Sequence, residues 1–253
     1  MTVSWGPDVA YYFFLIFARL GTILMLLPAL GEQTIPARLR LTFALAFAMI
    51  LYPLIWPALG PVPDTLGGLG AALGHELAIG FIIGGLIRLI LTAAQVAGAV
   101  IAFQMGLSMA QTSDPTQPGV QGAIVGNFLA MLGVMLIFAT DMHHMLLAGV
   151  YASYDYFPPD APLMLGDAAE MAVEIVALSF VVGVQMAAPL LIFGLVFYLG
   201  LGILGRLMPQ IQVFFMAMPA NIIIGLILFA LLLSLTMGLY MTHLEDHFSQ
   251  FLG

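Results

Sequence analysis

Long apolar runs are the feature of this sequence that most limits what it can fold into. A run of about 18 or more hydrophobic residues is long enough to cross a lipid bilayer as a helix. We identify six such runs: Val9 to Leu30, Leu39 to Leu59, Leu69 to Phe103, Ile124 to Tyr151, Ala168 to Leu204 and Ile211 to His243. Helices satisfy their own backbone hydrogen bonds in lipid. The sequence therefore predicts an all-α membrane protein, with one integral-membrane domain over residues 1–253.

Three of these runs, the third, fifth and sixth, are longer than the roughly 20 residues that a spanning helix needs. Each must tilt, kink or project beyond the bilayer. Pro189 and Pro219 lie inside the fifth and sixth runs. Because proline removes a helical hydrogen bond and clashes with the preceding turn, we expect these two positions to bend or break their helices.

The composition excludes several classes of protein. Only 7% of the residues are charged, against roughly 25% in an average soluble domain, so most of the surface must face lipid or other proteins. The five basic residues are all arginines, which argues against nucleic-acid binding. The absence of cysteine excludes disulfides, thiolate metal sites and cysteine nucleophiles.

Arginines are unevenly distributed between the breaks that separate the runs. Arg38, Arg40 and Arg206 stand in the first and fifth breaks, whereas the second break, the fourth break and both chain ends hold acidic residues without arginine. Cytoplasmic loops of membrane proteins are enriched in basic residues. We therefore expect the first, third and fifth breaks in the cytoplasm and both termini on the periplasmic side.

Two arginines, Arg19 and Arg88, lie deep inside apolar runs. A charge at mid-bilayer costs about 2.5–3.5 kcal/mol on insertion scales. One interpretation is a polar pathway through the membrane, and the other is burial in protein against a carboxylate. His75 and Glu76 open the third run and could supply that partner, so we favour the second interpretation.

Small residues recur at the spacing that lets membrane helices pack closely. The pairs and triplets are Gly80 with Gly84, Ala94 with Gly98 and Ala102, and Gly122 with Gly126. We expect these faces to be helix contacts.

Catalytic and metal motifs are weak or absent. The stretch "HELAIG" has Ile79 where a zinc protease needs its second histidine. Asp141, His143 and His144 lie close in sequence, but neighbouring histidines point to different helix faces and are expected to be poor joint ligands. Asp141 and His144 could share a face. We expect no catalytic residue, no metal site and no cofactor.

The third break, "QMGLSMAQTSDPTQPGVQG", is polar and contains proline, yet it carries a single charge. Met105 and Met109 flank its start at helical spacing. Methionine is flexible and fills irregular gaps, so this segment is either an ordinary solvent loop or a deformable seal.

Three stretches together, "EQTIPARLRL", "QMGLSMAQTSDP" and "GRLMPQIQVFFMAMP", resemble the R-type export-gate subunits of type III secretion systems, called FliR in flagella. The resemblance covers nearly the whole chain. It implies broken helical hairpins that assemble with P-type and Q-type subunits into a conical hetero-oligomeric gate in the bacterial inner membrane, beside the B-type and A-type export proteins. The gate, in a flagellar basal body or an injectisome, passes unfolded export substrates.

The resemblance also implies roles for particular residues. A channel plug, within the loop at residues 104–122, is carried over to Gln104, Met105, Gly106, Leu107, Ser108, Met109, Ala110, Gln111, Asp114 and Pro115. A turn that contacts neighbouring subunits is carried over to Arg206, Pro209, Gln210 and Pro219. Arg19, Arg88 and Glu76 are then charges buried in the assembly.

Two other functions remain open from the residues alone. A stand-alone transporter of small solutes would use the intramembrane charges of Arg19, Arg88 and Asp141. An intramembrane enzyme would use Asp141 and His144.

Overall fold

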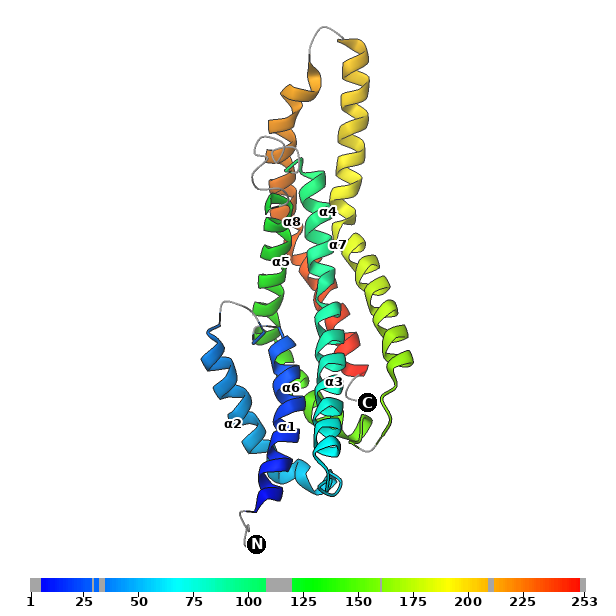
Figure 1. Cartoon of the computed structure of the whole chain (residues 1–253). Coiled ribbons are helices and arrows are strands. Elements are labelled where there is room, and N and C mark those ends of the chain that lie inside the picture. The colour runs from blue at the N-terminus through cyan, green and yellow to red at the C-terminus, as the bar shows by residue number, and fades with distance from the viewer. Residues whose placement is uncertain are drawn as a thin grey trace. The chain divides into compact units, whose positions relative to one another are not determined.

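The described chain is built from helices joined by short turns. The computed structural model describes residues 6–28, 30–31, 35–107, 120–159, 161–208 and 212–250. The helices are α1 (Pro7–Leu26), α2 (Ala37–Ile55), the 3-10 turn η1 (Trp56–Ala58), α3 (Leu66–Ile90), α4 (Thr92–Gln104), α5 (Val120–Ala139), α6 (Met142–Tyr156), α7 (Leu165–Leu207) and α8 (Val213–Gln250) (Figure 1). No strand occurs in these residues, which confirms the all-α prediction.

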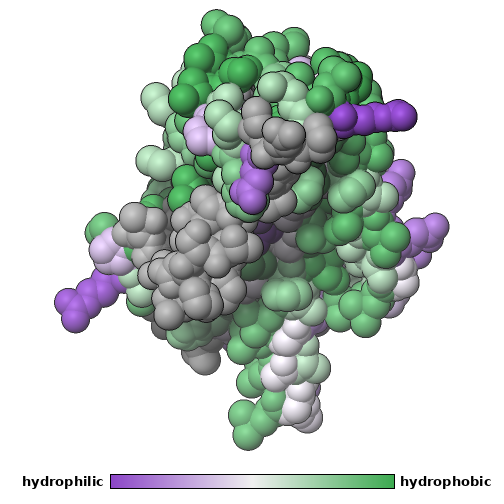
Figure 2. All heavy atoms as spheres, turned by 90° about the horizontal axis from the view of Figure 1, so that it is seen from above, coloured by the Kyte–Doolittle hydropathy of each residue, from purple (hydrophilic) through white to green (hydrophobic). Residues whose placement is uncertain are grey.

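The helices have the length and composition of membrane spans. Within the described ranges, five are long and apolar enough to cross a bilayer, or six if α5 and α6 together form one broken span. Figure 2 shows that hydrophobic residues cover most of the visible face and that hydrophilic residues stand out at a few separate points. The prediction of a membrane protein with about six long apolar segments is confirmed.

The helix breaks differ from those expected. The third run is divided at Leu91 into α3 and α4, and the fourth is divided at Thr140 and Asp141 into α5 and α6. By contrast, α7 continues through Pro189 and α8 continues through Pro219. Of the two expected effects of these prolines, a bend or a break, the break is therefore wrong. In an apolar segment the remaining backbone groups have no better partner than the helix itself, so a proline can be accommodated.

The chain divides into two compact units that interleave along the sequence. Unit 1 contains residues 1–90, 141–175 and 247–253, and unit 2 contains residues 91–140 and 176–246. In unit 1, α1 packs against both α2 and α3, and in unit 2, α4 packs against α5.

A buried ion pair joins α1 to α3 in unit 1. Both residues are buried: Arg19 is 0% exposed and Glu76 is 1% exposed. Arg19 Nε donates to Glu76 Oε2 at 2.6 Å, and Nη2 donates to Glu76 Oε1 at 3.0 Å. This two-point contact uses the planar fork of the guanidinium, which holds a carboxylate more strongly than a single bond does.

The same guanidinium also binds the carboxyl end of α6. Arg19 Nη1 donates to the backbone oxygens of Ser153 at 3.0 Å and Phe157 at 2.9 Å. The ring of Tyr154 lies 4.0 Å from Arg19 Cζ, a cation–π distance. A positive charge is favourable at this end of a helix because the terminal carbonyls are partly negative. One side chain therefore connects three helices of unit 1.

Glycines permit close helix approaches in both units. A Cβ on Gly80 of α3 would lie 2.8 Å from the carbonyl oxygen of Arg19, and one on Gly84 would lie 2.8 Å from Leu26 Cβ. In unit 2, a Cβ on Gly98 of α4 would overlap the backbone of Gly126 on α5. The expected packing role of these glycines is confirmed, whereas the contacts of Gly122 fall outside the described side chains.

We predict that Glu76→Gln destabilises the purified protein by about 3–5 kcal/mol, because the Arg19 charge would stay buried without a carboxylate. The measurement is thermal unfolding in detergent. Glu170→Gln is the matched control, since Glu170 is exposed in the same unit. Equal unfolding temperatures for the two variants would contradict the prediction. The double substitution R19M/E76M removes both charges and should recover much of the lost stability.

We predict that Gly98→Ala destabilises unit 2 by about 1–3 kcal/mol, the usual effect of forcing extra atoms into a tight contact. The added methyl group would meet backbone atoms of α5, which cannot move aside as a side chain can. Gly238→Ala in α8 is the control, because a Cβ at position 238 meets nothing within 4 Å. The same unfolding assay should show no loss for the control, and a loss of equal size in both would argue against the α4–α5 contact.

Candidate functional site

The predicted plug segment begins at a capped helix end in unit 2. The last four carbonyls of any α-helix lack partners inside the helix. At the end of α4, Met105 N donates to Ile101 O at 3.0 Å, Gly106 N to Phe103 O at 3.0 Å and Leu107 N to Ala102 O at 3.1 Å. The last two bonds form the Schellman motif, a common helix stop.

Gly106 is the residue that makes this cap possible. Its φ of 75° lies in the left-handed region, which residues with a Cβ rarely adopt. The glycine of "QMGL" therefore has a local structural reason: it ends α4.

The fourth carbonyl, that of Gln104, is satisfied from another helix. Asn221 of α8 donates its Nδ2 to Gln104 O at 3.1 Å. Asn221 is only 3% exposed, and its Oδ1 has no hydrogen-bond partner among the described residues. All four terminal carbonyls of α4 are thus paired, and one of the pairs is made by a side chain of α8.

Two glycines make room for the side chains of the capped turn. Met105 is fully buried, and a Cβ on Gly225 of α8 would lie 2.7 Å from its Cγ. A Cβ on Gly194 of α7 would overlap the side-chain amide of Gln104. We call Gly194, Asn221 and Gly225 the cap notch, since together they receive residues 104–106.

The other predicted plug and turn residues fall only partly within the described chain. Ser108, Met109, Ala110, Gln111, Asp114 and Pro115 lie outside the described residues, and so do Pro209 and Gln210. Arg206 is exposed in the last turn of α7. Pro219 is exposed in α8, two residues before Asn221.

Of the three charges expected to be buried, the structure buries Arg19 and Glu76 and leaves Arg88 exposed. Arg88 lies inside the apolar span Leu66–Gln104, which runs through Leu91, because Leu91 keeps helical backbone angles. The Arg88 side chain is on a face of that helix which the other described residues leave uncovered.

Asp141, His143 and His144 gather at the start of α6 in unit 1. Their ligand atoms all lie within 4.8 Å of one another. The two imidazole rings are 4.1 Å apart between centroids, so the expectation that neighbouring histidines diverge is wrong. Both side chains sit in the open first turn, after Asp141 with a φ of 60°, where the rings can lean together. This is a set of residues that could hold a divalent cation.

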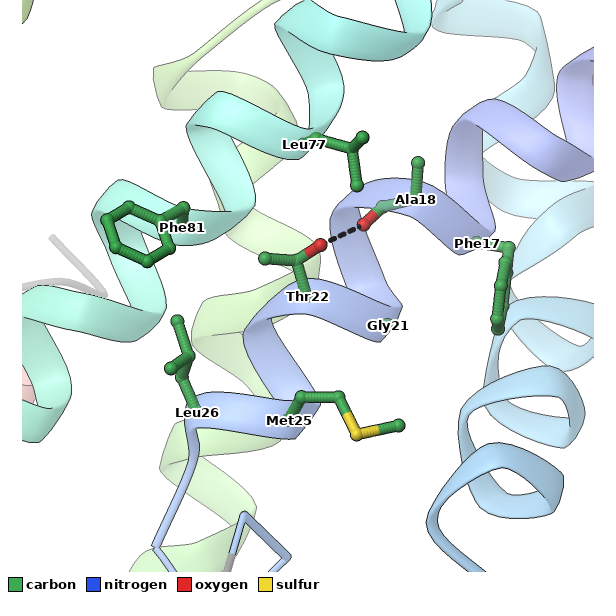
Figure 3. Close-up of a pocket in the computed structure, with 8 residues that line it drawn as sticks. All are labelled: Phe17, Ala18, Gly21, Thr22, Met25, Leu26, Leu77 and Phe81. Carbon is green, nitrogen blue, oxygen red and sulfur yellow. Dashed lines mark hydrogen bonds between the residues drawn. The ribbon is translucent and has the colours of Figure 1, made fainter. Parts of the chain in front are cut away.

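An apolar groove of about 320 Å³ lies between α1 and α3 in unit 1. Its lining residues are Phe17, Ala18, Gly21, Thr22, Met25, Leu26, Leu77 and Phe81 (Figure 3). Thr22 Oγ1 donates to the Ala18 carbonyl at 2.7 Å, within its own helix. The groove therefore presents carbon surface, without a titratable group, and suits an apolar group better than a polar solute.

Sequence reasoning missed the three residues of the cap notch. A signal for the cap was available, because glycine just after an apolar helical run often marks a helix end. Asn221 was a second signal, since a buried amide inside an apolar run needs a hydrogen-bond partner. Which carbonyl it would meet could not be read from the sequence.

Comparisons with known proteins agree with the resemblance drawn from the motifs. The model of the family "Bacterial export proteins, family 1" matches residues 10–249. The flagellar biosynthetic protein FliR of Caulobacter vibrioides is 49% identical over 220 residues, covering 87% of both chains. FliR of Bacillus subtilis is 31% identical, over 90% of this chain and 88% of the relative. FliR of Escherichia coli is 26% identical, over 92% and 87%.

The family match spans almost all of the described helices, and the relatives align over most of their own length. The prediction from the three motifs is thereby confirmed. This chain belongs to family 1 of the bacterial export proteins, the family of the flagellar biosynthetic protein FliR.

Proposed function

We propose that this protein is a non-enzymatic core subunit of the flagellar protein export gate, which lines the channel for unfolded substrates and closes it with the segment at residues 104–122. Its place among flagellar export components follows from its FliR relatives. The channel-closing role is supported by one observation above others: the segment starts from a sharply capped turn that α7 and α8 hold in the cap notch.

An obligate subunit suits the distribution of apolar surface. In each of α2, α7 and α8, only 17% of an apolar stretch of 18 residues is buried within the chain. Large side chains such as Ile192, Leu195 and Leu231 are well exposed there. Lipid or partner helices must cover them, and obligate interfaces are characteristically large and hydrophobic. We assign these faces to P-type and Q-type subunits and to lipid, with the B-type and A-type export proteins nearby.

The orientation we propose places the gate in the inner membrane with both termini in the periplasm. The support is the position of the arginines. Arg38 and Arg40 lie in the first turn of α2 and Arg206 in the last turn of α7, so these helix ends face the cytoplasm under the positive-inside rule.

The alternative of a stand-alone solute transporter is less well supported by the structure. Arg19, its strongest candidate, already binds Glu76 and two carbonyls of α6. Arg88 is exposed within the apolar span Leu66–Gln104. Arg19 therefore does not have the character of a free charge inside a polar pathway.

We predict that the protein purifies in a complex much heavier than its 27.1 kDa chain, because α7 and α8 leave large apolar faces uncovered. Native mass spectrometry in detergent measures the mass, and peptide sequencing identifies the other chains. A stable monomer with substrate-dependent solute flux would contradict the gate assignment and favour the transporter.

We predict that deleting Ser108 to Pro115 makes the assembled gate permeable to small solutes. The deletion removes predicted plug residues but keeps the α4 cap, so the helices should still pack. Solute uptake into liposomes that contain the purified complex is the measurement. Replacing the same eight residues with a glycine-serine linker of equal length is the matched variant, and it should leak less than the deletion. A deleted gate that assembles and stays as tight as the wild type would refute the plug.

A further inference from the structure

We infer that Asn221 is a positioning residue that fixes the first three plug residues, Gln104–Gly106, in the cap notch, and that this turn stays seated while substrates pass. The inference rests on the proposed function of the 104–122 segment as a plug. It adds a division of roles: the start of the segment is a fixed base built from α4, α7 and α8.

The first step of the argument is the pairing of the α4 carbonyls. The Schellman bonds and the Met105 amide satisfy three of the last four carbonyls within the turn itself. The Gln104 carbonyl is left over, and Asn221 Nδ2 is the donor that reaches it, at 3.1 Å. This hydrogen bond is partly buried, and a carbonyl that is shielded from water is costly to leave without a partner. Losing this amide would therefore loosen the turn from α8.

The second step is the steric fit of the notch. With any side chain at Gly225, a Cβ would lie 2.7 Å from Met105 Cγ and 3.1 Å from Met105 Cβ. At Gly194, a Cβ would overlap the Gln104 amide. Because both positions lack a side chain, α7 and α8 can approach the turn closely enough to leave Met105 fully buried.

The third step is the chemistry of Asn221 itself. It is 3% exposed, and its Oδ1 has no partner among the described residues. A leucine of similar volume would fill this space without burying an unpaired oxygen. Packing alone therefore does not explain an amide here. The Asn221 Nδ2 group donates to the turn at Gln104. It also lies close to Gly106, where an added Cβ would be 3.0 Å from Nδ2.

The first experiment replaces the amide with a side chain of similar size. Asn221→Leu should leave the yield and mass of the complex unchanged but raise solute leak through the closed gate about tenfold, the shift that losing one buried hydrogen bond of ordinary strength produces. Asn127→Leu is the matched control, because Asn127 is exposed on α5 in the same unit, and it should not leak. Wild-type tightness of an assembled Asn221→Leu gate would overturn the inference.

A second experiment tests whether residues 104–106 leave the cap notch during export. It does not depend on the folding of the leucine variant. The chain has no cysteine, so Met105→Cys with Gly225→Cys creates a unique pair. The present Cβ positions are 3.1 Å apart, slightly short of the roughly 3.5–4.5 Å of a disulfide. The Sγ of the cysteine introduced by Met105→Cys would take the place of Met105 Cγ, the atom nearest to a Cβ at position 225, so the closest contact becomes part of the disulfide bridge. The oxidised gate should secrete export substrates at the rate of the reduced gate. Secretion that stops on oxidation and returns with reductant would show that the turn must move.

These outcomes separate the inference from the function on which it rests. If the Ser108 to Pro115 deletion leaks but Asn221→Leu does not, the plug assignment is kept and the positioning role of Asn221 is rejected. If the deletion itself stays tight, the plug assignment fails directly. If both variants leak and the crosslinked gate still exports, the plug assignment and the fixed position of residues 104–106 are both supported.

Discussion

The guanidinium of Arg19 is the interaction on which unit 1 depends. It lies fully buried and bonds Glu76 of α3 and the last carbonyls of α6. The 2.6 Å contact between α1 and α3 requires the helices to be close, and Gly80 allows this because it lies against the Arg19 backbone. The ion pair therefore depends on Gly80: Arg19 and Glu76 can meet because α3 has no side chain at position 80 to keep it away from α1.

Unit 2 is held by contacts of a different kind. Among its described contacts, glycines such as Gly98 and Gly126 allow close approach, and the neutral amide of Asn221 bonds α8 to the end of α4. Apolar area alone cannot choose between helix and lipid as a neighbour in a membrane, because both are equally apolar. Close backbone contact and directional hydrogen bonds do favour a helix over lipid as the neighbour. A few small or polar residues can therefore determine the packing of such an apolar chain.

The sequence carried the class of the protein, its apolar segments, the glycine faces and the partnership of Arg19 with a carboxylate near the start of the third run. It did not carry the helix breaks. Leu91 has neither proline nor glycine beside it, and it keeps helical backbone angles, so no local pattern marks the boundary between α3 and α4. Arg88 lies inside an apolar span, as the sequence predicts, but the structure places it on an exposed face of that span. The partner of Asn221 lies 117 residues away, beyond any local pattern.

The capped turn changes how the letters "QMGL" should be interpreted. Gly106 ends the helix, Leu107 closes the Schellman bonds, and Gln104 and Met105 fit against glycines of α7 and α8. Each residue thus has a local reason that requires no contact with a substrate. Under the proposed function, this motif combines two roles along its length. The fixed base that we infer for its first residues is what a plug at the following residues needs in order to return to the same closed position after each substrate.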